Sequence, residues 1–351
     1  MKLVSIIGAR PQFIKYAPLS NTLKGRHTDI LVHTGQHYDP LLSKIFFDQM
    51  HIHSPEYNLK VGSLSHGKQI GMMMTRLEDI LVDEDPDFVL VYGDTNSTLA
   101  GALTTVKNNI PVAHVEAGIR SFDRSMPEEV NRVVTDHVSS VLFAPTVTAV
   151  HHLREEGIRT GVHMVGDIMV DALEQSMQVA RDSTILEDIG VTSDNYYLAT
   201  IHRPSNTDDK QMLHDILRAF SKADKPVVLP LHPRTGHYIR KHQLTLGRNI
   251  RVVEPVGYFD FLWLEKNCCK ILTDSGGIQK EAYLLGKPCV TLRLNTEWPE
   301  TVHEGWNLLV GSQMNSIVNA IHFFTPEGKQ KHYFGYGHTA EKIVRVLEGY
   351  L

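Results

Sequence analysis

The sequence has little of what marks metalloproteins, secreted proteins and membrane proteins. Its three cysteines, two of them adjacent at 268 and 269, give neither a disulfide framework nor a metal-ligand spacing. The 20 histidines include no HExxH motif, so we predict no metal site. No apolar run is as long as a membrane span, and the run at the start is too short for a secretory signal. We therefore expect a cytoplasmic protein that binds no membrane.

Charge and length narrow the class further. A net charge of −5 over 351 residues argues against a role in non-specific nucleic-acid binding. The chain is 42% hydrophobic and 21% charged, as in ordinary globular proteins, and its length suits two domains. The first strand-to-helix turn is not GxGxxG, so the dinucleotide interpretation is weak and we expect no cofactor.

Short apolar runs alternate with helical patterns along the whole chain. The runs lie at 2–7, 29–34, 87–92, 111–115, 138–143, 162–165, 196–201, 226–231, 250–253, 270–273 and 288–292. This alternation predicts an α/β fold with doubly wound parallel sheets. We place one Rossmann-like domain at 1–168 and a second at 169–337, with a ligand held in a cleft between them.

The stretch 86–132 carries acidic residues where strands end. Two successive apolar runs lead to Asp94 and Glu116, and Glu128 follows in the sequence PEEVNR, which ends at Arg132. Ligands bind at the carboxyl ends of strands in such sheets. Three carboxylates there are unsuited to a core and suited to proton transfer.

Two turns have the residue types that bind phosphate. Gly8 precedes a helix start with Arg10 and Lys15 close by, which makes an anion site, although solvated surface charges are the alternative. In the second half, 274–277 (Asp-Ser-Gly-Gly) opens another helix, and its glycines allow close backbone approach to a diphosphate. Glu281 in that helix could accept from sugar hydroxyls, unless this is only a tight turn with a surface acid.

Other polar residues also follow the ends of predicted strands. His202 and Arg203 could share charge with a phosphate or a leaving group, and His232 has a similar, weaker claim. Tyr258 could contact a base, with core packing as the alternative. His37 and Arg293 also follow predicted strands.

These parts favour a nucleotide sugar as ligand. A diphosphate site without an evident nucleophile or metal is compatible with glycosyl transfer or with chemistry on the sugar itself. The C2 hydrogen of a sugar is not acidic, but it can be removed as the anomeric diphosphate is expelled. Elimination and re-addition of UDP fit the three acids, the histidine and the phosphate-binding helix ends.

The motifs GARPQFIK, TGQH, YGDTNS, HVEAGIRS, PEEVNR, IHR, HPR, TDSGGIQKEA and GKPCVTLR, in this order, resemble the non-hydrolysing UDP-N-acetylglucosamine 2-epimerase family. The resemblance implies a GT-B fold, with a last helix at 338–351 that returns to the first domain. It implies interconversion of UDP-GlcNAc and UDP-ManNAc by anti elimination of UDP, a 2-acetamidoglucal intermediate and syn re-addition, without NAD. It assigns catalysis to Asp94, Glu116, Glu128 and His202. It assigns UDP binding to Arg10, Lys15, Ser275, Gly276, Gly277 and Glu281, with Tyr258 at the uracil.

Departures from the family pattern bear on substrate and regulation. No acid follows His202-Arg203 in the next loop, and Asp39 stands where members with an effector site often carry Gln, which leaves allosteric activation by UDP-GlcNAc open. Residues 279–282 and 296–298 look like the branch that acts on modified sugars, such as UDP-2,3-diacetamido-glucuronate or UDP-FucNAc-type sugars. We expect UDP-GlcNAc as substrate and a homodimer. The alternatives are a modified UDP-HexNAc, a GT-B glycosyltransferase and a UDP-sugar sensor.

Overall fold

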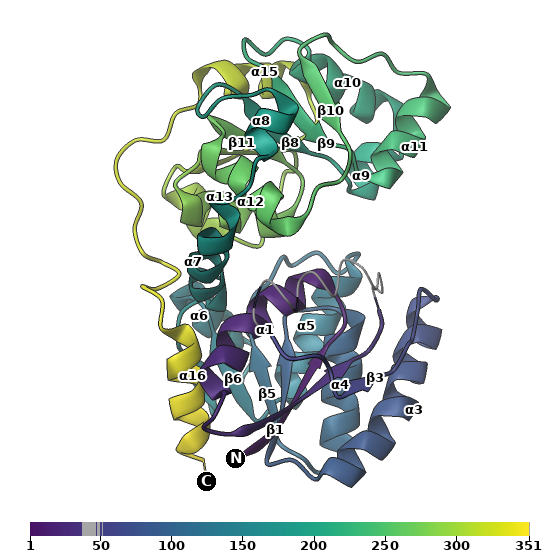
Figure 1. Cartoon of the computed structure of the whole chain (residues 1–351), viewed down its shortest axis with the longest axis vertical. Coiled ribbons are helices and arrows are strands. Elements are labelled where there is room, and N and C mark those ends of the chain that lie inside the picture. Colours follow the sequence, from purple (N-terminus) through teal and green to yellow (C-terminus); the bar gives the residue numbers. More distant parts are fainter. Residues whose placement is uncertain (37–46, 48–49, 51, 351) are drawn as a thin grey trace. The chain divides into compact units, whose positions relative to one another are not determined.

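The protein is described by a computed structural model that covers residues 1–36, 47, 50 and 52–350, without the side chain of Arg10. The chain divides into two compact units (Figure 1). Unit 1 comprises Met1–Gln175 and His332–Leu351, and unit 2 comprises Ser176–Lys331. In the described part of the chain no helix is both long and apolar enough to cross a membrane.

Unit 1 is built on a parallel sheet. Its strands are β1 (Lys2–Ile7), β2 (Thr28–His33), β3 (Tyr57–Asn58), β4 (Phe88–Tyr92), β5 (Val112–Val115), β6 (Val141–Ala144) and β7 (Val162–Met164). The spatial order β3-β2-β1-β4-β5-β6-β7 reverses direction between β1 and β4. Register there pairs Leu3 with Phe88. This reversal is the switch point beside which ligands bind in doubly wound sheets.

Helices cover both faces of this sheet. They are α1 (Arg10–Leu23), α3 (His66–Glu84), α4 (Asn96–Lys107), α5 (Pro127–Val138), α6 (Val147–Glu155), α7 (Ile168–Ala180) and α16 (Thr339–Glu348). Figure 1 shows α16, the last helix, beside α1, the first. The stripe of Met73, Leu77 and Leu81 buries α3 against Val4 and Val89 of the strands, because residues three to four apart share one helical face.

Unit 2 repeats the plan with a second parallel sheet. Its strands are β8 (Tyr197–Thr200), β9 (Val227–Pro230), β10 (Ile250–Val253), β11 (Lys270–Thr273), β12 (Cys289–Thr291) and β13 (Asn307–Leu309). The order is β10-β9-β8-β11-β12-β13, with the switch point between β8 and β11. Apolar side chains are buried on both faces of the sheet, as expected for parallel strands covered by helices.

The helices of unit 2 complete these layers. They are α8 (Ile185–Ile189), α9 (Pro204–Thr207), α10 (Lys210–Phe220), α11 (Pro233–His242), α12 (Tyr258–Asn267), α13 (Gly276–Leu285), α14 (Pro299–His303) and α15 (Met314–Phe323). The predicted α/β class with parallel, doubly wound sheets is confirmed. The short strands β3 and β13 lie outside the predicted runs, because strands of two and three residues are too short to give an apolar run of their own.

Candidate active site

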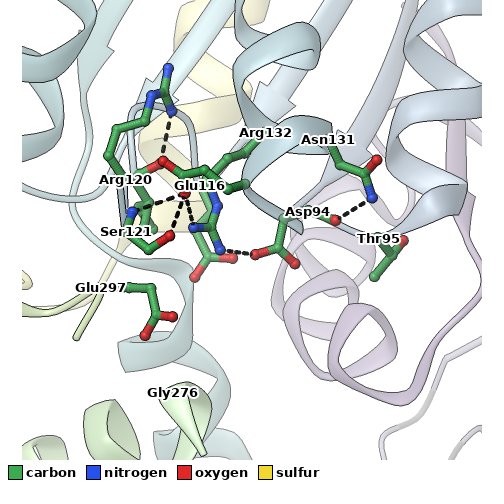
Figure 2. Close-up of polar contacts among 12 residues, drawn as sticks. Asp94, Thr95, Glu116, Arg120, Ser121, Asn131, Arg132, Gly276 and Glu297 are labelled. Atoms are coloured by element: carbon green, nitrogen blue, oxygen red, sulfur yellow. Dashed lines mark hydrogen bonds and ion pairs between the residues drawn. The ribbon is translucent and has the colours of Figure 1, made fainter. Parts of the chain in front are cut away.

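Asp94 lies just beyond the end of β4, where the chain turns towards α4. Its side chain is about one-third exposed and forms an ion pair with the buried Arg132 of α5. The amide of Asn131 donates to the Asp94 backbone oxygen over 2.9 Å. Figure 2 shows both α5 side chains directed at Asp94. The structure therefore brings Asp94 and Arg132 together.

Glu116 follows β5 and forms an ion pair with Lys15 of α1. Both side chains are largely buried, at 8% and 13% exposure. The backbone of Glu116 has φ +78°, a left-handed conformation that costs free energy for a residue with a side chain. Gly93 lies against the pair, since a Cβ on it would be 3.2 Å from Glu116 Oε2 and 3.1 Å from Lys15 Nζ. The site is thus packed around an ionised carboxylate held in a strained backbone.

The two acids of PEEVNR have different surroundings. Glu128 is exposed in the first turn of α5, whereas Glu129 is buried. Glu129 accepts from the Ser121 N–H and hydroxyl over 2.9 and 2.8 Å, and from Arg132 over 2.6 Å. Burial alone would raise the pKa of Glu129, but the bonds from Ser121 and the charge of Arg132 outweigh it and lower the pKa. Glu129 therefore supports Arg132, which in turn holds Asp94, and the sequence analysis did not single it out.

His202 lies just beyond the end of β8 in unit 2, beside a buried carboxylate. Its Nδ1 is 3.1 Å from Oδ1 of Asp274, which is fully buried and also accepts the backbone N–H groups of 202 and 203. Burial would raise the pKa of Asp274, but the bonds from His202 and Arg203 lower it. The ring of His232 lies 5.7 Å from that of His202, and its pKa is lowered by partial desolvation and by His202.

The turn from β11 into α13 is the predicted phosphate site. Ser275 is the N-cap residue, and the helix begins at Gly276. A Cβ on Gly276 would be 2.8 Å from Glu297 Oε2, so a larger residue there would displace the Glu297 carboxylate. At Gly277 the nearest described atom would be Ser275 Oγ at 3.9 Å, so packing leaves that side open. An open glycine at a helix N-terminus suits close approach of an anion.

Glu297 links two arginines beside this turn. Arg293 donates to it over 3.1 and 2.9 Å, and Arg203 lies 3.8 Å away. Burial would raise the pKa of Glu297, but the bonds and charge of Arg293, with Arg203, lower it. Glu297 thus holds two guanidiniums beside the start of α13, and guanidinium groups are suited to bind anionic ligands.

Tyr258 and Glu281 lie together. Tyr258 begins α12, is 5% exposed, and its hydroxyl is 3.5 Å from Glu281 Oε1 in α13. Lys280, which precedes Glu281, makes a second contact: its Nζ lies 4.3 Å from the centre of the Trp298 ring. The Trp298 indole N–H donates to the Gly276 carbonyl over 2.9 Å, which stabilises the turn into α13.

Three sequence predictions fall outside the described residues. These are His37, Asp39 and the side chain of Arg10. The residues that sequence reasoning missed are partners rather than contacts of a ligand: Glu129, Asn131, Asp274 and Glu297. Glu129, Asn131 and Asp274 each lie next to a predicted site residue in sequence, and Glu297 lies four residues after Arg293, but only the contacts in the fold reveal their roles.

Comparisons with known proteins place the chain in a family. The family model described as UDP-N-acetylglucosamine 2-epimerase matches residues 22–348. A UDP-N-acetylglucosamine 2-epimerase homolog of Methanococcus maripaludis is 51% identical, with 99% of each chain covered. A UDP-2,3-diacetamido-2,3-dideoxy-D-glucuronate 2-epimerase of Pseudomonas aeruginosa is 45% identical, also with 99% of each chain covered.

The fold is shared with solved structures as well. The crystal structure of Methanocaldococcus jannaschii UDP-GlcNAc 2-epimerase in complex with UDP-GlcNAc and UDP has a TM-score of 0.92 and 44% identity. It covers 99% of this chain and 100% of its own. The two parallel sheets with interleaved helices are thus a GT-B-like fold, as the resemblance implied. The chain belongs to the UDP-N-acetylglucosamine 2-epimerase family.

Proposed function

We propose that the protein interconverts UDP-GlcNAc and UDP-ManNAc by elimination and re-addition of UDP. One observation carries this proposal. Two neighbouring strands of unit 1 lead to carboxylates that each form an ion pair with a basic side chain. Asp94 pairs with Arg132, and Glu116 pairs with Lys15. A glycosyl transferase often needs one base, whereas moving a C2 proton off one face and back onto another needs more than one acid–base group.

In the elimination step, a carboxylate of unit 1 takes the C2 proton. The C–H electron pair forms the C1=C2 double bond, and the C1–O bond breaks with its electrons on UDP. Re-addition reverses these steps with the proton delivered to the opposite face of C2. Asp94, Glu116 and Glu128 are the proposed acid–base groups. None of these steps transfers a hydride, so the proposed route uses no hydride carrier.

Unit 2 supplies the groups proposed to hold UDP. The N-terminus of α13, with Ser275, Gly276 and the open side of Gly277, suits the diphosphate. The nitrogen-bearing side chains proposed to contact the diphosphate there are His202, Arg203, His232 and Arg293. Tyr258 and Glu281, which lie 3.5 Å apart, are proposed to hold the uracil and the ribose.

Transfer of solvent hydrogen tests the reaction. Incubation with UDP-GlcNAc in D₂O, without added cofactor, should give UDP-ManNAc with deuterium at C2. NMR follows the appearance of this product. An isomerised product without deuterium would contradict proton transfer at C2. Release of the sugar to an acceptor, with no isomerised nucleotide, would instead support a transferase.

A modified UDP-HexNAc is the second candidate substrate. The 45% identical Pseudomonas aeruginosa relative is a UDP-2,3-diacetamido-2,3-dideoxy-D-glucuronate 2-epimerase. Parallel NMR assays with UDP-GlcNAc and with the diacetamido-uronate will rank the two by kcat/KM.

We also infer a cytoplasmic homodimer, on the family resemblance. Light scattering coupled to size exclusion should give twice the mass of the 39.6 kDa chain. A monomeric mass under assay conditions would contradict the dimer.

A further inference from the structure

His114 lies within β5, two residues before Glu116, and is completely buried. Its Nε2 is 2.8 Å from the carbonyl oxygen of Gly93, and its Nδ1 is 2.7 Å from Oδ1 of Asp136 in α5. A carbonyl oxygen can only accept a hydrogen bond, so Nε2 must carry a hydrogen. The remaining question is which of Nδ1 and Asp136 carries the hydrogen between them.

The surroundings of Asp136 favour its ionised form. Its other oxygen accepts from the Gly118 N–H over 3.0 Å and lies 2.7 Å from Nη1 of Arg120. These two contacts stabilise the carboxylate whatever the charge of His114, because a backbone N–H group and a guanidinium both face that oxygen. With Asp136 ionised, Nδ1 is a donor too, and the imidazole carries both hydrogens.

The charges around the ring alternate in sign. The Arg120 guanidinium contacts two carboxylates. Its Nη1 lies beside Asp136, and its Nε and Nη2 each donate to Glu156 over 2.7 Å. Glu156, at the outer end of this chain, is 26% exposed and also lies 3.8 Å from His137, so the buried part of the chain is His114, Asp136 and Arg120. A neutral imidazole with its hydrogen on Nε2 would turn the Nδ1 lone pair towards Oδ1 of Asp136 at 2.7 Å, which is costly when both groups are buried.

We propose that His114 is held as an imidazolium whose Nε2–H bond to the Gly93 carbonyl positions Asp94 for catalysis. Gly93 immediately precedes Asp94, and its own N–H donates to Val115 of β5 over 3.0 Å. The turn is thereby tied to β5 through both backbone polar groups of Gly93, and the β5 residue that accepts the N–H, Val115, immediately precedes Glu116. His114 is a positioning residue in this scheme, and its catalytic consequence rests on the proposed function.

The charge state of His114 can be observed by NMR, without measuring enzyme activity. In the protein labelled with ¹⁵N-histidine, the His114 signals are identified by their loss in His114→Leu. Both ring nitrogens should show protonated shifts across the neutral pH range. In Asp136→Asn the new amide can donate to Nδ1, so one ring nitrogen should change to the unprotonated shift. An unprotonated ring nitrogen in the wild type would overturn the imidazolium.

Kinetics test the positioning. His114→Leu should lower kcat on the order of a hundredfold with little change in KM, because a displacement of about 1 Å costs that much. Asp136→Asn keeps the Gly93 bond through the neutral ring and should retain most of the activity that His114→Leu loses. His163→Leu, which removes a β7 histidine bonded to Tyr350 over 3.0 Å, is the matched control with wild-type kcat.

The outcomes separate the two claims. If His114→Leu does not fold, the double variant with Asp136→Asn removes the uncompensated charge and is measured instead. Wild-type kcat in the folded variant would overturn the positioning role. An inactive wild type would overturn the proposed function and the positioning role with it, while the spectrum would still decide the charge state.

Discussion

Oδ1 of Asp274 lies 3.1 Å from Nδ1 of His202, although the two residues are 72 positions apart in the sequence. The same buried carboxylate accepts the backbone N–H groups of 202 and 203 and the amide of Asn206. One side chain from the end of β11 therefore fixes the ring, the backbone and the helix start that follow β8. This leaves Nε2 of His202 as the nitrogen that can reach a ligand.

Asp274→Asn should lower kcat by up to about 10²–10⁴-fold, the range that a positioned acid–base group contributes. The variant keeps the shape of the side chain but loses the ion pair that orients the His202 ring. His202→Ala and the double variant complete a cycle measured by steady-state kinetics. Because the two residues act as a unit, the double variant should be no slower than His202→Ala. Additive losses would show that Asp274 acts independently of His202.

Asp94→Asn and Glu116→Gln should each bind UDP as the wild type does and lose turnover by about 10²–10⁴-fold. Both lie in unit 1, and neither belongs to the residues proposed to hold UDP. Calorimetry gives the UDP affinity, and deuterium incorporation at C2 gives the turnover. Glu155→Gln, on the surface of α6 beside His151, is the control and should be unchanged. Turnover retained in both site variants would refute the assignment of acids.

Gly276→Ala and Gly277→Ala form a matched pair at the N-terminus of α13. A Cβ at 276 would be 2.8 Å from Glu297, so this variant should be less stable and bind UDP poorly. A Cβ at 277 meets nothing closer than 3.9 Å and should leave the melting temperature unchanged while weakening UDP binding. Thermal unfolding and calorimetry measure the two effects. Full UDP affinity in Gly277→Ala would place the diphosphate elsewhere.

Glu297→Gln should be destabilised at neutral pH by about 3–5 kcal/mol, because it leaves buried guanidinium charge without its partner. The folded-state pKa of Glu297 lies below its ordinary value of 4.5. Its contribution is thus present above pH 4.5 and is lost as pH falls through the folded pKa. The stability difference from wild type, measured by urea unfolding, should shrink as the pH is lowered below 4.5. A difference independent of pH would mean that packing, and not charge, causes the loss.

Much of the fold could be predicted from the sequence, because the signals are local. Apolar runs bounded by turn residues marked β1, β4 and β11, and alternation with helices predicted parallel sheets. The spatial order of the strands could not be predicted this way. It depends on which faces the helices cover, and β13 is too short to give a pattern of its own.

The candidate site could likewise be predicted only in part from the sequence. The sequence by itself determined which residue types stand at the strand ends, and hence Asp94, Glu116, His202 and the glycine turn at 276. Only the tertiary structure decided their partners. Glu128 and Glu129 are neighbours in the chain, but about 100° apart around α5, so one is exposed and the other is buried beneath Arg132. A helix face is buried or exposed according to what packs against it, and that choice is made between segments far apart in the sequence.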